Sequence, residues 1–161
     1  MKALGDYRSN WSSEAGTPEL SSMQWNLLAI PAAVLAVMAI LQIISFGRFK
    51  DWLESIRVGW PVAVAVVVII AELWGAVSLL RVPLSAMVRF AGLSLAVLVL
   101  GFWFIENLYL ATSSGGQLPS SGYFGKYLNQ QPGWWTIAEI TIMLFWVVYA
   151  AELLKWRPNN R

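Results

Sequence analysis

AELWGAVSLLRVPLSAMVRFAGLSLAVLVLGFWFIENLYL, residues 71–110, is the stretch that decides the fold of this chain. Almost all of its side chains are apolar, and a short break near Arg81 divides it into two runs. The first run completes an apolar stretch that begins before residue 71, and the second is long enough by itself to cross a bilayer. Four ionisable side chains nevertheless lie within the stretch: Glu72, Arg81, Arg89 and Glu106.

The composition of the whole chain points to a membrane protein. Hydrophobic residues make up 58% of the 161 residues, charged residues make up 12%, and the mean hydropathy is +0.59. A soluble domain would carry roughly twice that charged fraction. The composition therefore predicts one integral membrane domain whose partner is the lipid bilayer, and no binding of nucleic acid is expected.

Hydropathy predicts four membrane spans. A helix of roughly 20 residues crosses about 30 Å of hydrocarbon, and backbone groups in lipid must pair within the helix. The expected spans are residues 25–46, 60–80, 84–110 and 134–154. The third is longer than the bilayer requires, so we expect it to tilt or protrude. The predicted fold class is all-α, an integral membrane four-helix bundle.

Polar tails are expected on both sides of this bundle. The chain is expected to divide into three parts: a polar N-terminal tail over 1–24, a four-span membrane domain over 25–155 and a basic C-terminal tail over 156–161. The first tail lacks the basic-then-apolar order of a cleaved signal peptide, so we expect the first span to be retained. Ser21 and Gln24 have the spacing of a capping box at its start.

A short amphipathic segment, GRFKDWLESIRVGWP, lies between the first two spans. Its apolar residues recur at helical spacing, which predicts an interfacial helix over about 48–58 with its apolar face toward the lipid. These residues are Phe49, Trp52, Leu53 and Ile56. The segment is either a connector at the headgroups or a surface that docks a partner, with Trp52 as a candidate contact.

The third loop, residues 111–133, is rich in Ser and Gly and then carries three aromatic residues beside Lys126. Exposed aromatic residues in a loop often mark a surface that another molecule covers. Tyr123, Phe124 and Tyr127 are therefore candidate partner contacts. A solvated loop, or a loop that packs onto its own bundle, is the alternative.

The chain contains no Cys and no His. Disulfide and thiol chemistry are thereby excluded, as is iron-sulfur ligation by Cys. The chain also lacks the imidazole that usually binds haem, copper or zinc and that often serves as a general base. We therefore predict no catalytic residues, no metal site and no cofactor, and leave contact with a lipid, a quinone or a pigment open without support from an axial ligand.

The distribution of Lys and Arg favours both termini in the cytoplasm. Arg81 and Arg89 lie at the turn between the second and third spans, on the same side as the basic C-terminal tail. The opposite side carries basic residues after the first span and in the third loop. We expect a bacterial inner membrane as the location of the protein.

Glu72 is expected near the middle of the bilayer, since it precedes Arg81 by nine residues, or roughly 13 Å of helix. A bare carboxylate at that depth is costly, so it must be protonated, paired or in a wet interior. One hypothesis makes Glu72 a proton or ligand site supported by Arg89. The other makes it a buried carboxyl that fixes the packing of the second and third spans.

The other charges lie nearer the membrane surfaces. Arg89 is one to two turns into the third span, from which its side chain would reach the interface or lean toward Glu72. Glu106 and Glu139 lie on the opposite side of the membrane, and both are candidate polar residues of functional or packing importance. Trp103 is one of seven Trp residues expected in the interfacial aromatic belt.

Residues 46–100 resemble the DoxX/MauE-like family of four-helix membrane proteins. The resemblance rests on FGRFKDWLESIRVGWP followed by AELWGAVSLLRVPLSAMVRFAGLSLAVLVL. These carry an amphipathic segment with a Lys, a Gly/Pro start to the second span, Glu72 followed by small residues, and an Arg-bearing turn. The resemblance covers about a third of the chain. A His common near the end of the family's third helix is absent here.

The resemblance implies a non-catalytic membrane subunit, without a cofactor of its own, that supports or scaffolds a larger redox, respiratory or photosynthetic complex. A second hypothesis is a small-molecule or proton transporter. Four helices with one charge at the midplane make a thin pore, so transport would require a homo-oligomer. Co-purifying subunits would favour the first hypothesis, and flux in liposomes by a homo-oligomer would favour the second.

Overall fold

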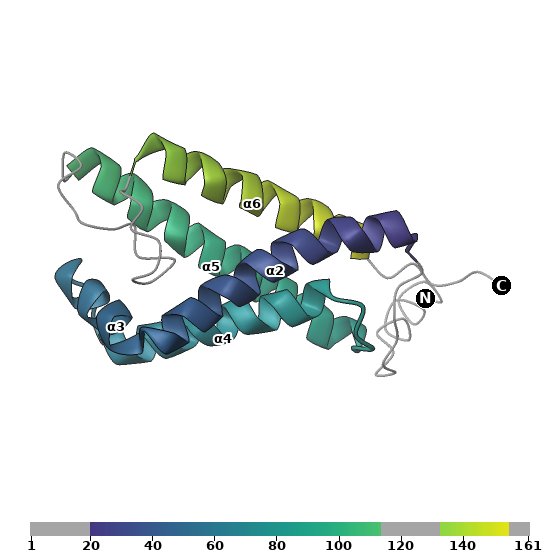
Figure 1. Cartoon of the computed structure of the whole chain (residues 1–161), viewed down its shortest axis with the longest axis horizontal. Helices are drawn as coiled ribbons and strands as arrows, with labels where there is room; N and C mark the ends of the chain where they lie inside the picture. The colour runs from purple at the N-terminus through teal and green to yellow at the C-terminus, as the bar shows by residue number, and fades with distance from the viewer. Residues whose placement is uncertain (1–19, 114–132, 155–161) are drawn as a thin grey trace, which may run out of the picture.

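The computed structural model describes residues 20–113 and 133–154, and these form five helices (Figure 1). The described part of the chain contains no strand, so the predicted all-α bundle is confirmed. The helices are α2 (Ser22–Ile44), α3 (Phe46–Ser55), α4 (Pro61–Leu79), α5 (Ala86–Ser113) and α6 (Trp134–Leu154).

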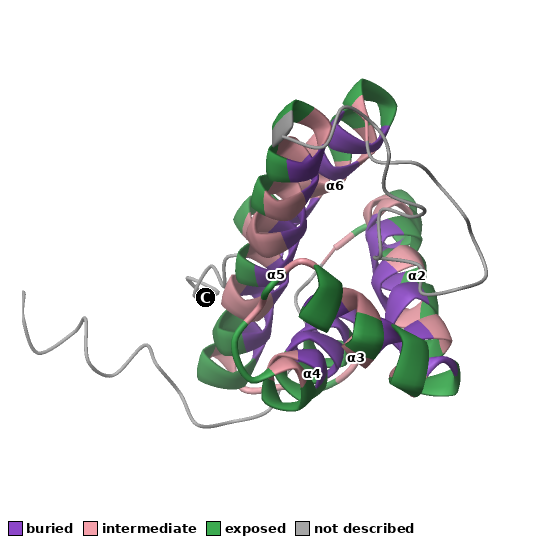
Figure 2. Ribbon diagram, turned by 90° about the vertical axis from the view of Figure 1, so that its left-hand side faces the viewer, coloured by how far each residue is buried: buried purple, intermediate pink, exposed green. Residues whose placement is uncertain are grey.

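Four of the helices, α2, α4, α5 and α6, are long and apolar enough to cross a membrane. Their bounds lie within three residues of the expected spans. At most half of the most apolar part of each is buried inside the chain, and exposed residues lie along the outward sides of the helices (Figure 2). Many of these exposed residues have large aliphatic or aromatic side chains. Such surfaces suit lipid and not water, so the chain is an integral membrane protein.

Helices that follow one another along the chain pack together. α4 lies between α2 and α5, and α6 packs on the other side of α5 (Figure 1). The start of α2, the turn between α4 and α5, and the end of α6 lie at one end of the bundle. We call this the hinge end, after the hinge at residues 80–85, and the opposite end, which carries α3, the α3 end.

The start of α2 is fixed by the predicted capping box. Ser21 Oγ accepts a hydrogen bond from the backbone N–H of Gln24, and Gln24 Oε1 accepts one from the backbone N–H of Ser21. Two backbone donors that the first helical turn leaves unpaired are thereby satisfied. The helix therefore begins at Ser22, a few residues before the expected start of the first span.

Small residues bring α4 and α5 into close contact. A Cβ added to Gly75 would lie 2.7 Å from Ala96 Cβ, and one added to Gly92 would overlap the side chains of Ser78 and Trp74. Since neither glycine has a side chain, the two helix backbones approach more closely than larger residues would permit. Small residues thus set the close spacing of α4 and α5.

The core consists of two clusters of apolar side chains. One lies toward the hinge end and joins α2, α4, α5 and α6, with members such as Leu28, Leu79 and Val147. The other lies toward the α3 end and includes Phe49, Leu53 and Trp103. The second cluster therefore contains part of α3, which is a departure from the sequence prediction.

The amphipathic helix α3 exists as predicted, but its apolar face does not point into lipid. Phe49 and Leu53 are 1% and 0% exposed, and they pack against α4 and the bundle core. The expectation of an apolar face toward the lipid was wrong because the bundle leaves a hydrophobic end near Trp103 that α3 covers. Burial against protein and burial in lipid require the same sequence pattern, so periodicity could not distinguish them.

Candidate functional site

The polar centre of the bundle is Glu72 on α4, whose side chain is 0% exposed. Its Oε1 accepts a hydrogen bond from Gln42 Nε2 at 3.0 Å and another from Trp103 Nε1 at 2.9 Å. Gln42 belongs to α2 and Trp103 to α5. One carboxyl oxygen thus connects three of the four spans.

The second carboxyl oxygen, Glu72 Oε2, has no hydrogen-bond partner within residues 20–113 and 133–154. No cation within those residues forms an ion pair with Glu72 either. An isolated carboxylate in such surroundings is far more costly to bury than a neutral carboxylic acid. The geometry thus favours the neutral acid, whose remaining oxygen carries the proton.

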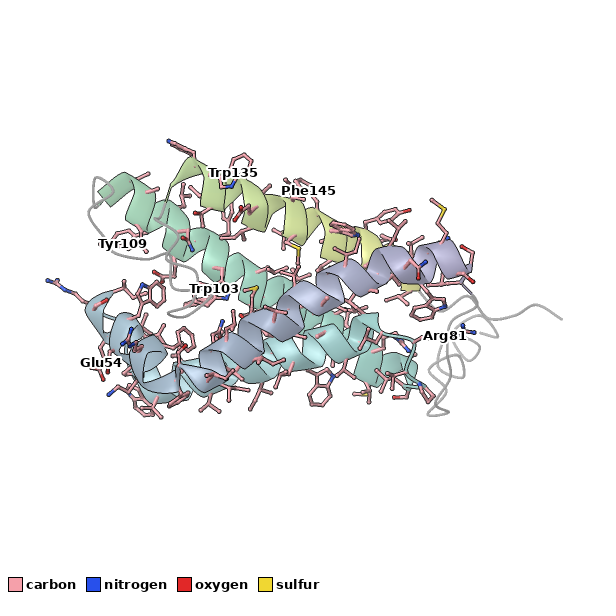
Figure 3. All side chains as sticks on the ribbon, in the orientation of Figure 1. Glu54, Arg81, Trp103, Tyr109, Trp135 and Phe145 are labelled. Atoms are coloured by element: carbon pink, nitrogen blue, oxygen red, sulfur yellow. The ribbon has the colours of Figure 1, made fainter. Side chains whose placement is uncertain are left out.

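Trp103 is the main departure from the expected aromatic belt. Its ring is 0% exposed and points into the bundle, whereas Tyr109, Trp135 and Phe145 point outward (Figure 3). The expectation of an interfacial position was wrong because it used depth alone and did not specify which face of α5 the residue occupies. The hydrogen bond to Glu72 satisfies the indole N–H, which a buried Trp needs.

Aromatic side chains surround the indole of Trp103. The centroid of its ring lies 5.5 Å from that of Trp52, 5.9 Å from that of Phe49 and 5.2 Å from that of Phe102. Trp52 and Phe49 come from α3, and their own rings are 6.3 Å apart. Trp52, a candidate partner contact in the sequence, is half-buried and covers the polar centre in this structure.

Gln42 was not among the candidates from sequence, although a signal was present. It is the only polar residue between residues 27 and 44, an otherwise apolar run within the first span. Its side chain is 0% exposed. A lone amide in a membrane helix commonly bonds to a polar group on a neighbouring helix, and Glu72 was the nearest candidate in depth.

Arg89 serves the hinge, and it does not support Glu72. Its Nη1 donates to the carbonyl oxygen of Ser78 at 2.6 Å and to that of Leu80 at 3.2 Å, and its Nη2 donates to that of Val82 at 2.6 Å. The hypothesis that Arg89 supports Glu72 as a functional pair is therefore wrong in this geometry. The guanidinium instead satisfies carbonyl groups at the end of α4, which have no partner inside the helix.

Glu106 and Glu139 lie apart from the polar centre. Both are half-buried, Glu106 near the end of α5 and Glu139 near the start of α6, so both belong to the α3 end of the bundle. Asn107, which follows Glu106 in the sequence, is fully buried, and its Nδ2 donates to the carbonyl oxygen of Trp103 at 2.9 Å. The donors to Glu72 are Gln42 and Trp103, and not these residues.

The remaining sequence candidates are Tyr123, Phe124 and Tyr127, which lie outside the described residues. So do the tails over most of 1–24 and over 156–161. Within the described ranges, no group of three or more His, Cys, Asp and Glu side chains is arranged to hold a metal ion. The polar centre has one carboxyl, one amide and one indole, which suits hydrogen bonding to a neutral group better than ligation of a cation.

The outer face of α3 is charged. Lys50 Nζ lies 3.2 Å from Asp51 Oδ1 and 3.5 Å from Glu54 Oε1. The hydrogen bond to Asp51, together with the charges of both carboxylates, raises the pKa of Lys50 above its ordinary value. All three side chains belong to α3, so these ion pairs stabilise the helix itself and do not attach it to the bundle.

Comparisons with known proteins give no match: no family model, no curated protein and no solved structure matches the chain. The resemblance of residues 46–100 to the DoxX/MauE-like family stays a prediction.

Proposed function

We propose that this chain is a non-catalytic integral membrane subunit that supports or scaffolds a larger membrane complex of redox, respiratory or photosynthetic type. The observation that carries the proposal is the bonding of Glu72 Oε1 to both Gln42 and Trp103. In this role the buried carboxyl joins α2, α4 and α5 into one fixed unit. Its hydrogen bonds are used for packing and not for turnover.

The chemistry of the sequence supports a partner that performs the reaction. The chain has neither His nor Cys, so its own side chains offer few groups for redox or hydrolytic catalysis. The resemblance of residues 46–100 to DoxX/MauE-like proteins adds support, since it implies a subunit beside catalytic partners. A bacterial inner membrane with both termini in the cytoplasm is part of the proposal, on the basis of the Lys and Arg distribution.

The outward face of α6 supports an assembly role. Only 28% of its most apolar part is buried within the chain, the lowest share of the four spans. Its exposed side chains include Trp134, Trp135, Ile142, Phe145 and Tyr149. We propose that a partner subunit packs against this face, where large aromatic residues give the most contact area per side chain.

Purification in a mild detergent from native membranes tests the proposal. We expect the chain to elute with other membrane subunits in fixed proportion, and the variants Phe145→Ala and Trp135→Ala to reduce the amount that co-elutes. Val67→Ala on α4, also an exposed apolar residue, is the control and should leave the complex intact. Elution of the wild-type chain alone would contradict the proposal.

The alternative is a homo-oligomeric transporter of protons or small molecules. The observation in its favour is Glu72 Oε2, a buried carboxyl oxygen without a partner in the described residues. Purified chain in liposomes that contain a pH-sensitive dye would then show proton flux. Glu72→Gln would abolish that flux and leave the fold intact, whereas a scaffold gives no flux with either protein.

A further inference from the structure

The start of α4 carries an open apolar groove on the outer surface of the bundle. The groove has a volume of about 560 Å³, which is within the range of sites that hold small molecules. Apart from one Trp, all of its lining side chains are aliphatic, so the groove suits a hydrocarbon chain. The lining residues are Trp60, Pro61, Val62, Ala63, Val66 and Val67.

The groove runs along the first two turns of α4 on a face that points away from the bundle. Val62, Ala63, Val66 and Val67 are all exposed, and their spacing puts them on one side of the helix. Residues 61–67 cover roughly 10 Å of helix, and one leaflet contains about 15 Å of hydrocarbon. The groove therefore matches the part of an acyl chain that lies nearest its headgroup.

Trp60 closes the groove at the end where the span begins. Its side chain is 84% exposed, the highest value among the large hydrophobic side chains of the described residues. A Trp at this level presents an apolar ring to acyl chains and an N–H to the polar groups of lipids. The indole of Trp60 thus suits the boundary between the chain and the headgroup of a single lipid.

Arg57 provides a positive charge three residues before Trp60. Consecutive Cα atoms are 3.8 Å apart, so the two Cα atoms are separated by at most about 11 Å. Arg57 and Trp60 have φ values of 61° and 58°, the two positive values among non-glycine residues of the described chain. Such conformations are costly for L-residues and are often found where a ligand is held.

Neighbouring carboxylates do not neutralise Arg57. Its side chain is exposed, and the two ion pairs found in residues 20–113 and 133–154 join Lys50 to Asp51 and to Glu54. A guanidinium binds a phosphate through two parallel hydrogen bonds. An anionic headgroup suits Arg57 better than a zwitterionic one, because it has a net negative charge and no ammonium group that would be repelled.

We propose that the groove at the start of α4 binds one anionic phospholipid. The phosphate binds the guanidinium of Arg57, the indole of Trp60 lies beside the glycerol, and an acyl chain lies along Ala63 and Val67. The bound lipid fixes the segment between α3 and α4 at the membrane surface. This inference goes beyond a scaffold role and does not depend on it, because a subunit of a complex and a transporter would both present this groove to lipid.

Native mass spectrometry of the full chain, purified in mild detergent and freed of lipid, tests the proposal. Phosphatidylglycerol and phosphatidylcholine with the same acyl chains are titrated in parallel, and the fraction of chain with one bound lipid is measured. We expect phosphatidylglycerol to bind at a several-fold lower concentration. Glycerophosphoglycerol has the same headgroup without acyl chains, so it should not displace the lipid at equal concentration.

Two variants remove the two halves of the site, and each has a matched control. Arg57→Asn removes the cation and keeps a residue that tolerates the left-handed conformation; Arg48→Gln removes an exposed cation near the start of α3. Ala63→Phe fills the groove, and Ala91→Phe adds the same ring at an exposed position of α5. We expect Arg57→Asn and Ala63→Phe to weaken phosphatidylglycerol binding several-fold, and both controls to match the wild type.

A second readout is thermal unfolding, because a ligand that binds the folded state stabilises it. Phosphatidylglycerol should raise the Tm of the wild type more than that of Arg57→Asn. Ala63→Leu, which favours a helix, replaces Ala63→Phe if the latter does not fold.

Several results would overturn the site. Equal binding of the two lipids by the wild type excludes selection of an anionic headgroup, and an equal loss in Arg48→Gln reduces the effect to general attraction of charge. A loss in only one of Arg57→Asn and Ala63→Phe means that headgroup and chain do not share one site. A dimer of the chain that Ala63→Phe converts to a monomer would assign the groove to a second copy instead of a lipid.

Discussion

The indole N–H of Trp103 donates to Oε1 of Glu72 at 2.9 Å, so a residue of α5 holds the one fully buried carboxyl group of α4. The same oxygen accepts a second hydrogen bond from α2, through Gln42. Both donors are buried, and removal of the carboxyl would break both of these hydrogen bonds together. This shared dependence determines the expected effects of substitutions at the polar centre.

Glu72→Ala should lower the free energy of unfolding by about 2–4 kcal/mol, because it leaves a gap and removes the shared acceptor of two buried hydrogen bonds. Glu72→Gln keeps the shape and one carbonyl oxygen, so it should stay within about 1 kcal/mol of the wild type. Thermal unfolding in detergent, followed by size-exclusion chromatography, measures both. If the Gln variant assembles and functions like the wild type while the Ala variant is unstable, a proton-carrier role for Glu72 would be excluded.

Trp103→Phe separates the hydrogen bond of this residue from its packing. The variant keeps an aromatic ring against Trp52 and Phe49 but removes the donor, so a loss of about 1 kcal/mol is expected. Trp103→Ala also empties the space that the ring fills, and should cost roughly 3–5 kcal/mol. Denaturant titration of the two variants would contradict this account if Phe and Ala were equally destabilising.

Gly92→Ala should force α4 and α5 apart, because the added Cβ would overlap the side chains of Ser78 and Trp74. We expect a loss of roughly 1–3 kcal/mol, typical of an overpacked interface. Gly101→Ala on the same helix is the matched control, since its Cβ would meet nothing within 4 Å. Ala is a better helix former than Gly, so the control should be neutral or more stable by up to about 1 kcal/mol.

Arg89→Ala should destabilise the hinge by roughly 2–4 kcal/mol, because it removes charge-assisted hydrogen bonds to the carbonyl groups of Ser78, Leu80 and Val82. Arg81→Ala, at an exposed position of the same hinge, should change stability little. Limited proteolysis of the turn between α4 and α5 reports the local effect. Equal protease sensitivity of the two variants would remove the structural role assigned to Arg89.

Orientation is tested with single cysteines at the two ends of α4. Leu80→Cys at the hinge and Gly59→Cys before α4 are both exposed, and the native chain has no thiol. With cytoplasmic termini, an impermeant maleimide added to intact cells should modify Gly59→Cys and spare Leu80→Cys. A thiol near Ser114 should behave like Gly59→Cys, and the reverse pattern would invert the topology.

The sequence predicted the helices well, because lipid imposes a length and a composition that can be counted. The bounds of α2, α4, α5 and α6 lie close to the expected ranges, and the capping box at Ser21 was correctly predicted. These features depend on local sequence.

The site was harder to predict because it depends on rotation of each helix about its axis. Glu72 was recognised as the central polar residue, but its partners were not. Arg89 was assigned to Glu72 by depth, although its guanidinium points to the hinge. Apolar residues surround each span on all sides, so the pattern does not identify the inward face of α5, and Trp103 was placed at the membrane surface for that reason.

The order in which α2, α4, α5 and α6 pack together has a consequence for biosynthesis. Each span after the first packs against one synthesised before it, and only the contact of α6 with α2 closes the arrangement at the hinge end. When α4 leaves the insertion machinery, Gln42 on α2 is already present to bond Glu72. The carboxyl group therefore has a hydrogen-bond donor on an earlier helix before Trp103 is made.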